Sequence, residues 1–128
     1  MTLIALQGIF QRDNEKVRKN LKLQIESAGF VVEEAENGLD GLAKVKGQTF
    51  DGFVIDYKMP KVNGITLIKN ILELPDYDSH QVLLLSTEQS NEFNALVSPL
   101  NLPNVLYKPV DPLKFSEILA SFSQLAAA

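Results

Sequence analysis

Five short apolar runs alternate with amphipathic stretches along the 128 residues of this chain, and this alternation restricts the fold more than any other feature of the sequence. The runs Phe53–Ile55, Val82–Leu85 and Val105–Tyr107 are apolar throughout, which is typical of strands that are covered on both faces. The two earlier runs are Leu3–Phe10 and Phe30–Val32. We therefore predict five strands in the order of these runs.

The stretches between the runs have the apolar spacing of helices, with apolar residues recurring every three or four positions. Helices are predicted to follow the turns at Asp13-Asn14, Asn37-Gly38, Asn63-Gly64 and Asp111-Pro112. The segment Asn91–Pro99 has the weakest helical pattern. Five repeats of strand and helix predict an α/β fold, in which a five-stranded parallel sheet carries helices on both faces.

Composition excludes several classes of protein. The 45% of apolar residues is enough for a core, and a net charge of −4 gives no electrostatic reason to bind nucleic acid or an anionic membrane. The absence of cysteine excludes disulfides and thiolate metal sites, and the single histidine, His80, excludes a multi-histidine site. No apolar run approaches membrane-spanning length, and the N-terminus does not resemble a signal peptide, so we expect a cytoplasmic protein.

Polar residues end four of the apolar runs. We expect the first strand to end at Arg12-Asp13, the third at Asp56, the fourth at Ser86-Thr87 and the fifth at Lys108. Because the carboxyl ends of parallel strands meet at one edge of the sheet, these groups are predicted to share a pocket. A carboxylate nucleophile, with a hydroxyl and an ammonium to bind phosphoryl oxygens, suits phosphoryl transfer, and a second carboxylate suits Mg²⁺. Each residue alone is more often a cap or a loop residue, but the four together favour a site.

The segment Val54–Gly64, VIDYKMPKVNG, resembles the phosphoacceptor segment of response-regulator receiver domains of two-component signalling, of the kind found in chemotaxis regulators. Ser86 follows Asp56 by 30 residues, and Lys108, in the sequence YKP, follows Ser86 by 22, as in that family. Glu33–Leu42 also resembles the second strand and the loop after it. The resemblance extends over residues 3–125 and implies a flavodoxin-like fold with strand order 2-1-3-4-5. We expect one domain over residues 1–125, with residues 126–128 as a short added tail.

The resemblance also implies a role for each pocket residue. Asp56 would accept a phosphoryl group from a histidine of a sensor kinase or phosphotransfer protein. Asp13, Asp56 and the backbone carbonyl of Lys58 would hold Mg²⁺, the one cofactor implied. Lys108 would pair with the acceptor carboxylate, and Ser86 would move to bond the phosphoryl group and begin a conformational switch.

Two further features follow from the same resemblance. The peptide bond between Lys108 and Pro109 is expected to be cis, as only an X-Pro bond readily allows. Lys58 and Glu88 occupy positions that flank the mouth of the pocket in the family. We expect these two side chains to approach each other and to restrict the attack of water on the acyl phosphate.

Three departures from the family pattern change the expected chemistry. Arg12 occupies a position that is usually acidic, so Mg²⁺ binding is expected to be weak. Val105 occupies the position of an aromatic switch residue, and we expect Tyr107 to be displaced to the neighbouring face of the strand. Thr87 occupies a position where the family favours a smaller side chain.

Three functions remain open at this point. The first is a phosphorylatable receiver with at most self-phosphorylating and self-dephosphorylating activity, which would control an output partner or domain. The second is a pseudo-receiver that is not phosphorylated, because the Arg12 guanidinium could pair with Asp56 in place of Mg²⁺. The third is a phosphatase of the haloacid-dehalogenase type, but Lys58 stands where such an enzyme needs its second Asp. No direct contact with nucleic acid or membrane is expected, and homodimerisation is left open.

Overall fold

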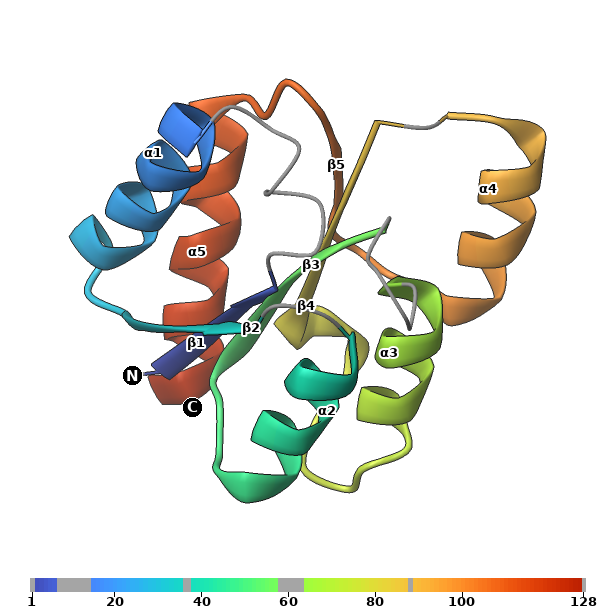
Figure 1. Ribbon diagram of the computed structural model, residues 1–128, viewed down its shortest axis with the longest axis horizontal. Helices are drawn as coiled ribbons and strands as arrows, with labels where there is room; N and C mark the ends of the chain where they lie inside the picture. The colour runs from blue at the N-terminus through green and yellow to red at the C-terminus, as the bar shows by residue number, and fades with distance from the viewer. Residues whose placement is uncertain (1, 7–14, 36–37, 58–63, 88, 128) are drawn as a thin grey trace.

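A computed structural model describes residues 2–6, 15–35, 38–57, 64–87 and 89–127 (Figure 1). The strands are β1 (Thr2–Leu6), β2 (Val31–Ala35), β3 (Gly52–Asp56), β4 (Val82–Ser86) and β5 (Val105–Tyr107). The α-helices are α1 (Glu15–Ser27), α2 (Gly38–Gly47), α3 (Gly64–Leu72), α4 (Asn91–Val97) and α5 (Pro112–Ala127). Two short 3₁₀ helices, η1 (Ser79–Gln81) and η2 (Ser98–Leu100), precede β4 and follow α4.

The strands form one sheet in the order β2-β1-β3-β4-β5, and every described pairing is parallel. Helices α1 and α5 cover one face, and α2, α3 and α4 cover the other (Figure 1). The predicted architecture, a parallel sheet with helices on both faces, is therefore confirmed. This arrangement brings the carboxyl ends of β3, β4 and β5 to one edge of the sheet.

Each face of the sheet has its own apolar core, and the central strands contribute to both. Every residue of β3 and β4 is buried. Successive side chains point to opposite faces, so Phe53 and Ile55 join α2 and α3 in one cluster while Val54 joins α1 and α5 in the other. Gly52 is needed at the start of β3, because a Cβ there would lie 2.6 Å from the ring of Phe122 on α5. The continuous apolar pattern of these strands thus reflects burial on both sides.

Three predicted boundaries, those of β2, α4 and α5, differ from the structure. β2 starts one residue after the run Phe30–Val32 begins and continues to Ala35, because an edge strand keeps pairing through partly exposed glutamates. β1 ends at Leu6, and the rest of the run Leu3–Phe10 lies outside the described residues. α4 ends at Val97, where the chain turns into η2 with a proline in its first turn. α5 reaches Ala127, two residues into the predicted tail, since alanine favours helix.

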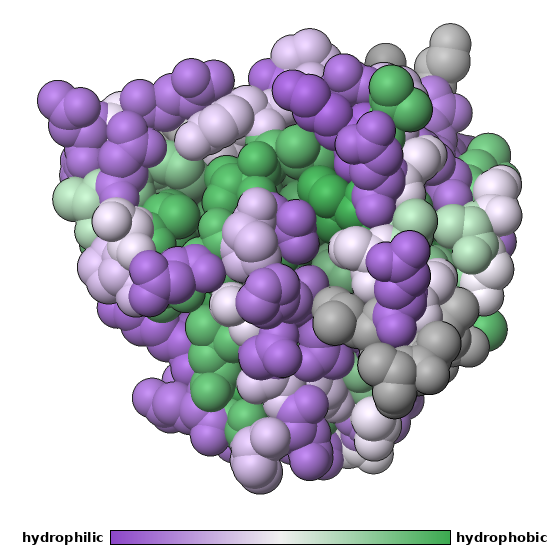
Figure 2. All heavy atoms as spheres, turned by 180° about the vertical axis from the view of Figure 1, so that it is seen from behind, coloured by the Kyte–Doolittle hydropathy of each residue, from purple (hydrophilic) through white to green (hydrophobic). Residues whose placement is uncertain are grey.

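The second edge strand, β5, is only partly buried along its three residues. Figure 2, the view from behind, shows apolar surface in a hollow in the upper half of the molecule, the half that holds α4 and β5 in Figure 1.

No helix within the described ranges is both long and apolar enough to cross a bilayer.

Candidate functional site

Three of the predicted site residues come together at the carboxyl edge of the sheet. Asp56 is the last residue of β3, Ser86 is the last residue of β4, and Lys108 directly follows β5. Within the described part of the chain, Asp56 and Ser86 are the only buried polar side chains, at 2% and 1% exposed. A buried carboxylate is unfavourable without a compensating charge or hydrogen bonds, so its surroundings are informative.

Lys108 supplies the compensating charge. Its Nζ donates a hydrogen bond to Oδ2 of Asp56 at 2.6 Å, and the two side chains are 11% and 2% exposed. The short distance and the burial make this a charge-assisted bond in a region of low dielectric constant. No buried side-chain nitrogen or oxygen of the described residues lacks a hydrogen-bond partner. The Asp56 carboxylate is therefore held at the end of the central strand with its charge opposed by that of Lys108.

Backbone bonds hold the three strand ends in register. The Tyr57 N–H donates to the Leu85 carbonyl, and the Lys108 N–H donates to the Ser86 carbonyl, both at 2.9 Å. The start of α3 is held to the strand end by the Gly64 N–H, which donates to the Tyr57 carbonyl at 2.9 Å. A Cβ at Gly64 would overlap the Asp56 carbonyl oxygen. Only glycine lets the first turn of α3 approach the strand end this closely.

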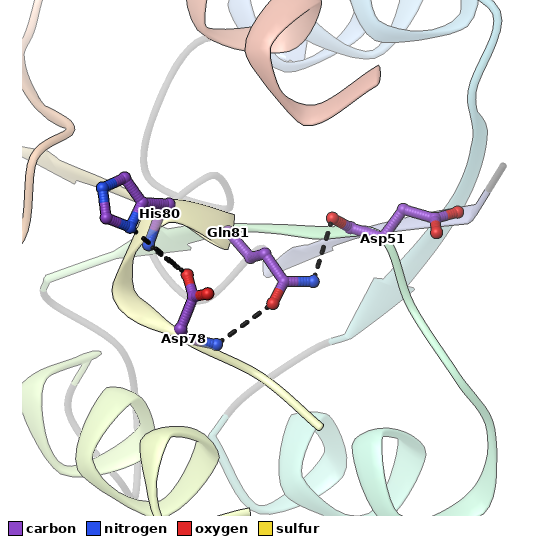
Figure 3. Close-up of polar contacts among 4 residues, drawn as sticks. All are labelled: Asp51, Asp78, His80 and Gln81. Atoms are coloured by element: carbon purple, nitrogen blue, oxygen red, sulfur yellow. Dashed lines mark hydrogen bonds and ion pairs between the residues drawn. The ribbon is translucent and has the colours of Figure 1, made fainter. Parts of the chain in front are cut away.

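A second polar cluster, at the opposite end of the strands, has a structural role (Figure 3). Asp78 caps η1 by accepting from the His80 N–H at 2.8 Å, and the Gln81 side chain accepts from the Asp78 N–H at 3.0 Å. Gln81 also donates to the Asp51 carbonyl at 3.5 Å, which joins the start of β4 to the start of β3. The side chains of Asp78 and His80 are both 67% exposed. His80 thus lies far along the strands from Asp56 and serves the cap.

A known protein family matches most of this chain. Residues 12–120 match the response regulator receiver domain. The chain belongs to this family. As a receiver domain, it is a signalling domain of two-component systems rather than a classical enzyme. The resemblance inferred from Val54–Gly64 is confirmed.

Individual relatives agree with this assignment. The chemotaxis protein CheY of Treponema pallidum is 32% identical over 113 residues, which cover 85% of this chain and 76% of that protein. A solved chemotaxis response regulator of Vibrio cholerae has a TM-score of 0.76 at 25% identity, covering 94% and 97% of the two chains. The signal receiver domain of a histidine kinase from Syntrophus aciditrophicus has a TM-score of 0.82 at 18% identity, with 99% and 93% covered, and shows the shared fold.

Four of the predicted pocket residues of this receiver domain, Arg12, Asp13, Lys58 and Glu88, lie outside the described residues. Their predicted roles in Mg²⁺ binding and at the pocket mouth therefore stay predictions. Thr87 is described and exposed, one residue past the buried Ser86. The Lys108-Pro109 bond is cis, as the family resemblance implies.

The prediction for Tyr107 is wrong in one respect. Val105 and Tyr107 do not lie on opposite faces of β5, because both pack against the core cluster that contains Phe93 of α4. Residues two apart in a strand point the same way, so an aromatic ring moved by two positions stays on the same face. Leu106, between them, packs against the other cluster. The aromatic ring has therefore moved along the strand, closer to Lys108.

Receiver domains generally bind Mg²⁺ at the phosphorylation site. The Asp56 carboxylate supplies oxygen atoms of the kind that this ion prefers. In the ranges that the structure describes, no group of three or more His, Cys, Asp or Glu side chains is placed to hold a metal. Asp56 is thus the described member of the predicted ligand set, and its chemistry fits the ion.

The sequence provided no expectation for Phe93, although its ring contacts two tyrosines that are sequence neighbours of Asp56 and Lys108. The ring centroid of Phe93 is 4.8 Å from that of Tyr57 and 6.2 Å from that of Tyr107. The only available signal was a phenylalanine three residues after Ser90, a residue type that often caps helices. Ser90 does cap α4, since its Oγ accepts from the Phe93 N–H at 3.1 Å.

Proposed function

We propose that this receiver domain accepts a phosphoryl group on Asp56 from a phosphohistidine of a sensor kinase or phosphotransfer protein. The observation that supports the proposal is the buried pair of Asp56 and Lys108 beside Ser86, at the carboxyl ends of three adjacent strands. A carboxylate oxygen attacks phosphorus, the bond from phosphorus to the imidazole nitrogen breaks, and an acyl phosphate forms on Asp56. The response then passes to an output partner or domain.

The residues of the chain have separate tasks in this proposal. Lys108 holds Oδ2 of Asp56 and so fixes the plane of the carboxylate before the reaction. Afterwards its ammonium and the Ser86 hydroxyl bind phosphoryl oxygens. Asp56, Asp13 and the Lys58 carbonyl would hold Mg²⁺, which, when bound, neutralises charge on the phosphoryl oxygens. Residues 1–125 are proposed to act as the complete receiver domain.

The test is incubation with acetyl phosphate and Mg²⁺, followed by intact mass measurement. We expect the unaltered chain to gain the mass of one phosphoryl group, and the Asp56→Asn variant to gain none, because an amide is not the nucleophile. Asp51→Asn is the matched control, since Asp51 directly precedes β3 at its other end and should not affect labelling. Equal labelling of Asp56→Asn would show that the acceptor has been assigned wrongly.

A second candidate, the pseudo-receiver, is favoured by the ion pair at the strand end. The Lys108 ammonium lies 2.6 Å from Oδ2 of Asp56, so this carboxylate has a compensating charge without Mg²⁺. Arg12 occupies a position that is usually acidic in the family, which would leave Mg²⁺ with fewer carboxylates. Under this alternative the unaltered chain shows no mass gain with acetyl phosphate.

Replacing Arg12 by aspartate tests the metal site directly. We expect the unaltered chain to bind Mg²⁺ weakly and Arg12→Asp to bind it more tightly. A guanidinium about 6 Å from a divalent ion costs roughly 6 kcal/mol at an effective dielectric constant near 20, and solvent and salt reduce this to about 1–2 kcal/mol. The expected gain in affinity is therefore about fivefold to thirtyfold.

This affinity can be measured through tyrosine fluorescence, because the chain has no tryptophan and Tyr57 follows Asp56. Lys19→Asp is the control, since Lys19 is exposed on α1 and the replacement changes the net charge equally. Equal affinities for the unaltered chain and for Arg12→Asp would place Arg12 away from the metal.

A dehalogenase-type phosphatase receives no support from the family assignment.

A further inference from the structure

A cleft of about 370 Å³ lies between the ends of helices α2 and α3, at the edge of the sheet opposite Asp56. One wall is the end of α2 with the loop after it, residues 45–49, and the other is the loop after α3, residues 74–77. These loops come before β3 and β4, and α2 and α3 lie side by side in Figure 1. Ligand pockets enclose roughly 300–1,000 Å³, so the volume of this cleft suits a molecule about the size of an amino acid.

The protein itself holds the two walls of the cleft together. The Tyr77 hydroxyl accepts a hydrogen bond from the Phe50 N–H at 3.1 Å, and the Tyr77 ring meets Phe53 edge to face at a centroid distance of 4.8 Å. Val45, which is 4% exposed, and the partly buried Leu74 belong to the same core region and give the cleft an apolar lining. A preformed cavity with an apolar lining is the usual arrangement of a small-molecule site.

The two walls of the cleft carry opposite charges. Lys46 comes from α2, and Asp76 comes from the loop after α3. Within the described part of the chain, neither side chain takes part in an ion pair, so both charges are available to a ligand. The last four carbonyl groups of α2 have no partner inside the helix, and of the described backbone N–H groups only that of Gln48 reaches one of them, the Lys44 carbonyl at 3.1 Å. The carboxyl end of a helix favours a cation, so an ammonium group suits this end of the cleft.

We propose that this cleft binds a small zwitterion with an apolar side chain, of the kind that a free amino acid provides. The ligand carboxylate pairs with Lys46, and the ligand ammonium lies between Asp76 and the carboxyl end of α2. The apolar side chain of the ligand covers Val45 and Leu74 and excludes water from them. A ligand with only one of the two charges leaves Lys46 or Asp76 without an opposite charge. Because the cleft lies at the amino ends of the strands, the proposal holds whether or not Asp56 is phosphorylated.

Titration with L-leucine, followed through the backbone amide signals in NMR spectra, tests the site. We expect the amides of Gly47, Thr49 and Tyr77 to shift with a dissociation constant of about 1 mM, as suits a small ligand held by exposed charges, while the amides of α5 keep their positions. N-acetyl-L-leucine lacks the ammonium group and L-leucinamide lacks the carboxylate. Each of these analogues should bind about fivefold more weakly than leucine, or weaker still.

Variants of the two charged residues identify the contacts. Lys46→Met and Asp76→Asn should each weaken leucine binding about fivefold or more. Lys69→Met and Glu73→Gln are the matched controls, because they remove the same charges from exposed positions that do not line the cleft, and both should bind leucine as the unaltered chain does. The absence of these amide shifts up to about 50 mM leucine, where a millimolar site is saturated, overturns the proposal. Binding of either analogue as tight as that of leucine, or unchanged binding by Lys46→Met or by Asp76→Asn, overturns it as well.

Discussion

Replacing Gly64 by alanine is expected to lower the free energy of unfolding by about 1–3 kcal/mol, the usual range for forcing an added methyl group into a packed region. The added Cβ would overlap the carbonyl oxygen of Asp56 and lie 3.0 Å from the Tyr57 Cα. These are backbone atoms of a buried strand end, which no side-chain rotation can move aside. Either α3 must shift outward or the end of β3 must move.

Gly47→Ala is the control for this experiment. Gly47 ends α2, and a Cβ there would meet no atom within 4 Å. That replacement should leave stability unchanged or raise it by about 0.4–1 kcal/mol, because alanine restricts the unfolded chain. Urea unfolding of both variants measures the difference, and acetyl phosphate labelling of Gly64→Ala should also be slower than that of the unaltered chain. Equal midpoints for Gly64→Ala and Gly47→Ala would mean that the approach of α3 to Asp56 is not tight.

Asp56 and Ser86, which the sequence predicted at strand ends, share one property: each ends a strand that is buried on both faces. The strands before Asp56 and Ser86 are uninterrupted apolar runs, so their ends are unambiguous and the parallel topology brings them together. Lys108 follows a shorter run, but the proline after it stops the strand. The meeting of these three residues therefore depends on local patterns and one rule of sheet topology.

The features that were missed depend on packing between segments far apart in the chain. β2 lies at the edge of the sheet, where Glu33 and Glu34 are partly exposed. An apolar run therefore predicts only the part of this strand that precedes the glutamates. α4 buries a single residue, and one buried phenylalanine produces no helical periodicity. Phe93 contacts Tyr57, which follows β3, and Tyr107, which ends β5. No short stretch of sequence contains all three residues, so no local pattern predicts these contacts.

Membership of the receiver family and phosphorylation are separate questions in this chain. The fold, the buried Asp56 and its bond to Lys108 are what a phosphorylatable receiver needs. They are also compatible with a pseudo-receiver, because Lys108 already places a compensating charge beside Asp56. The phosphorylatable receiver and the pseudo-receiver differ in whether acidic side chains bind Mg²⁺ beside the acceptor. Arg12 occupies a position that is usually acidic in the family. Labelling by acetyl phosphate and Mg²⁺ affinity therefore decide between them independently of the fold.

Replacing Lys108 by methionine is expected to lower the free energy of unfolding by about 3–5 kcal/mol, the usual cost of removing one member of a buried ion pair. Methionine keeps the length and apolar stem of lysine but removes the ammonium that lies 2.6 Å from Oδ2 of Asp56. Lys22→Met is the matched control, since Lys22 is 3.9 Å from Glu34 on the surface and such pairs contribute about 0–1 kcal/mol.

A double-mutant cycle identifies the cause of the expected loss. If the loss of the Lys108 ammonium from beside the Asp56 carboxylate is responsible, adding Asp56→Asn to Lys108→Met should restore part of the stability, because the amide carries no charge to compensate. Urea unfolding of the two single variants and the double variant measures this coupling. Losses that simply add in the double variant would show that the Lys108 ammonium stabilises the fold through groups other than the Asp56 carboxylate. In that case the contact between Asp56 and Lys108 would contribute to phosphoryl chemistry and not to stability. Each residue could then be replaced in labelling experiments without a correction for the stability effect of the other.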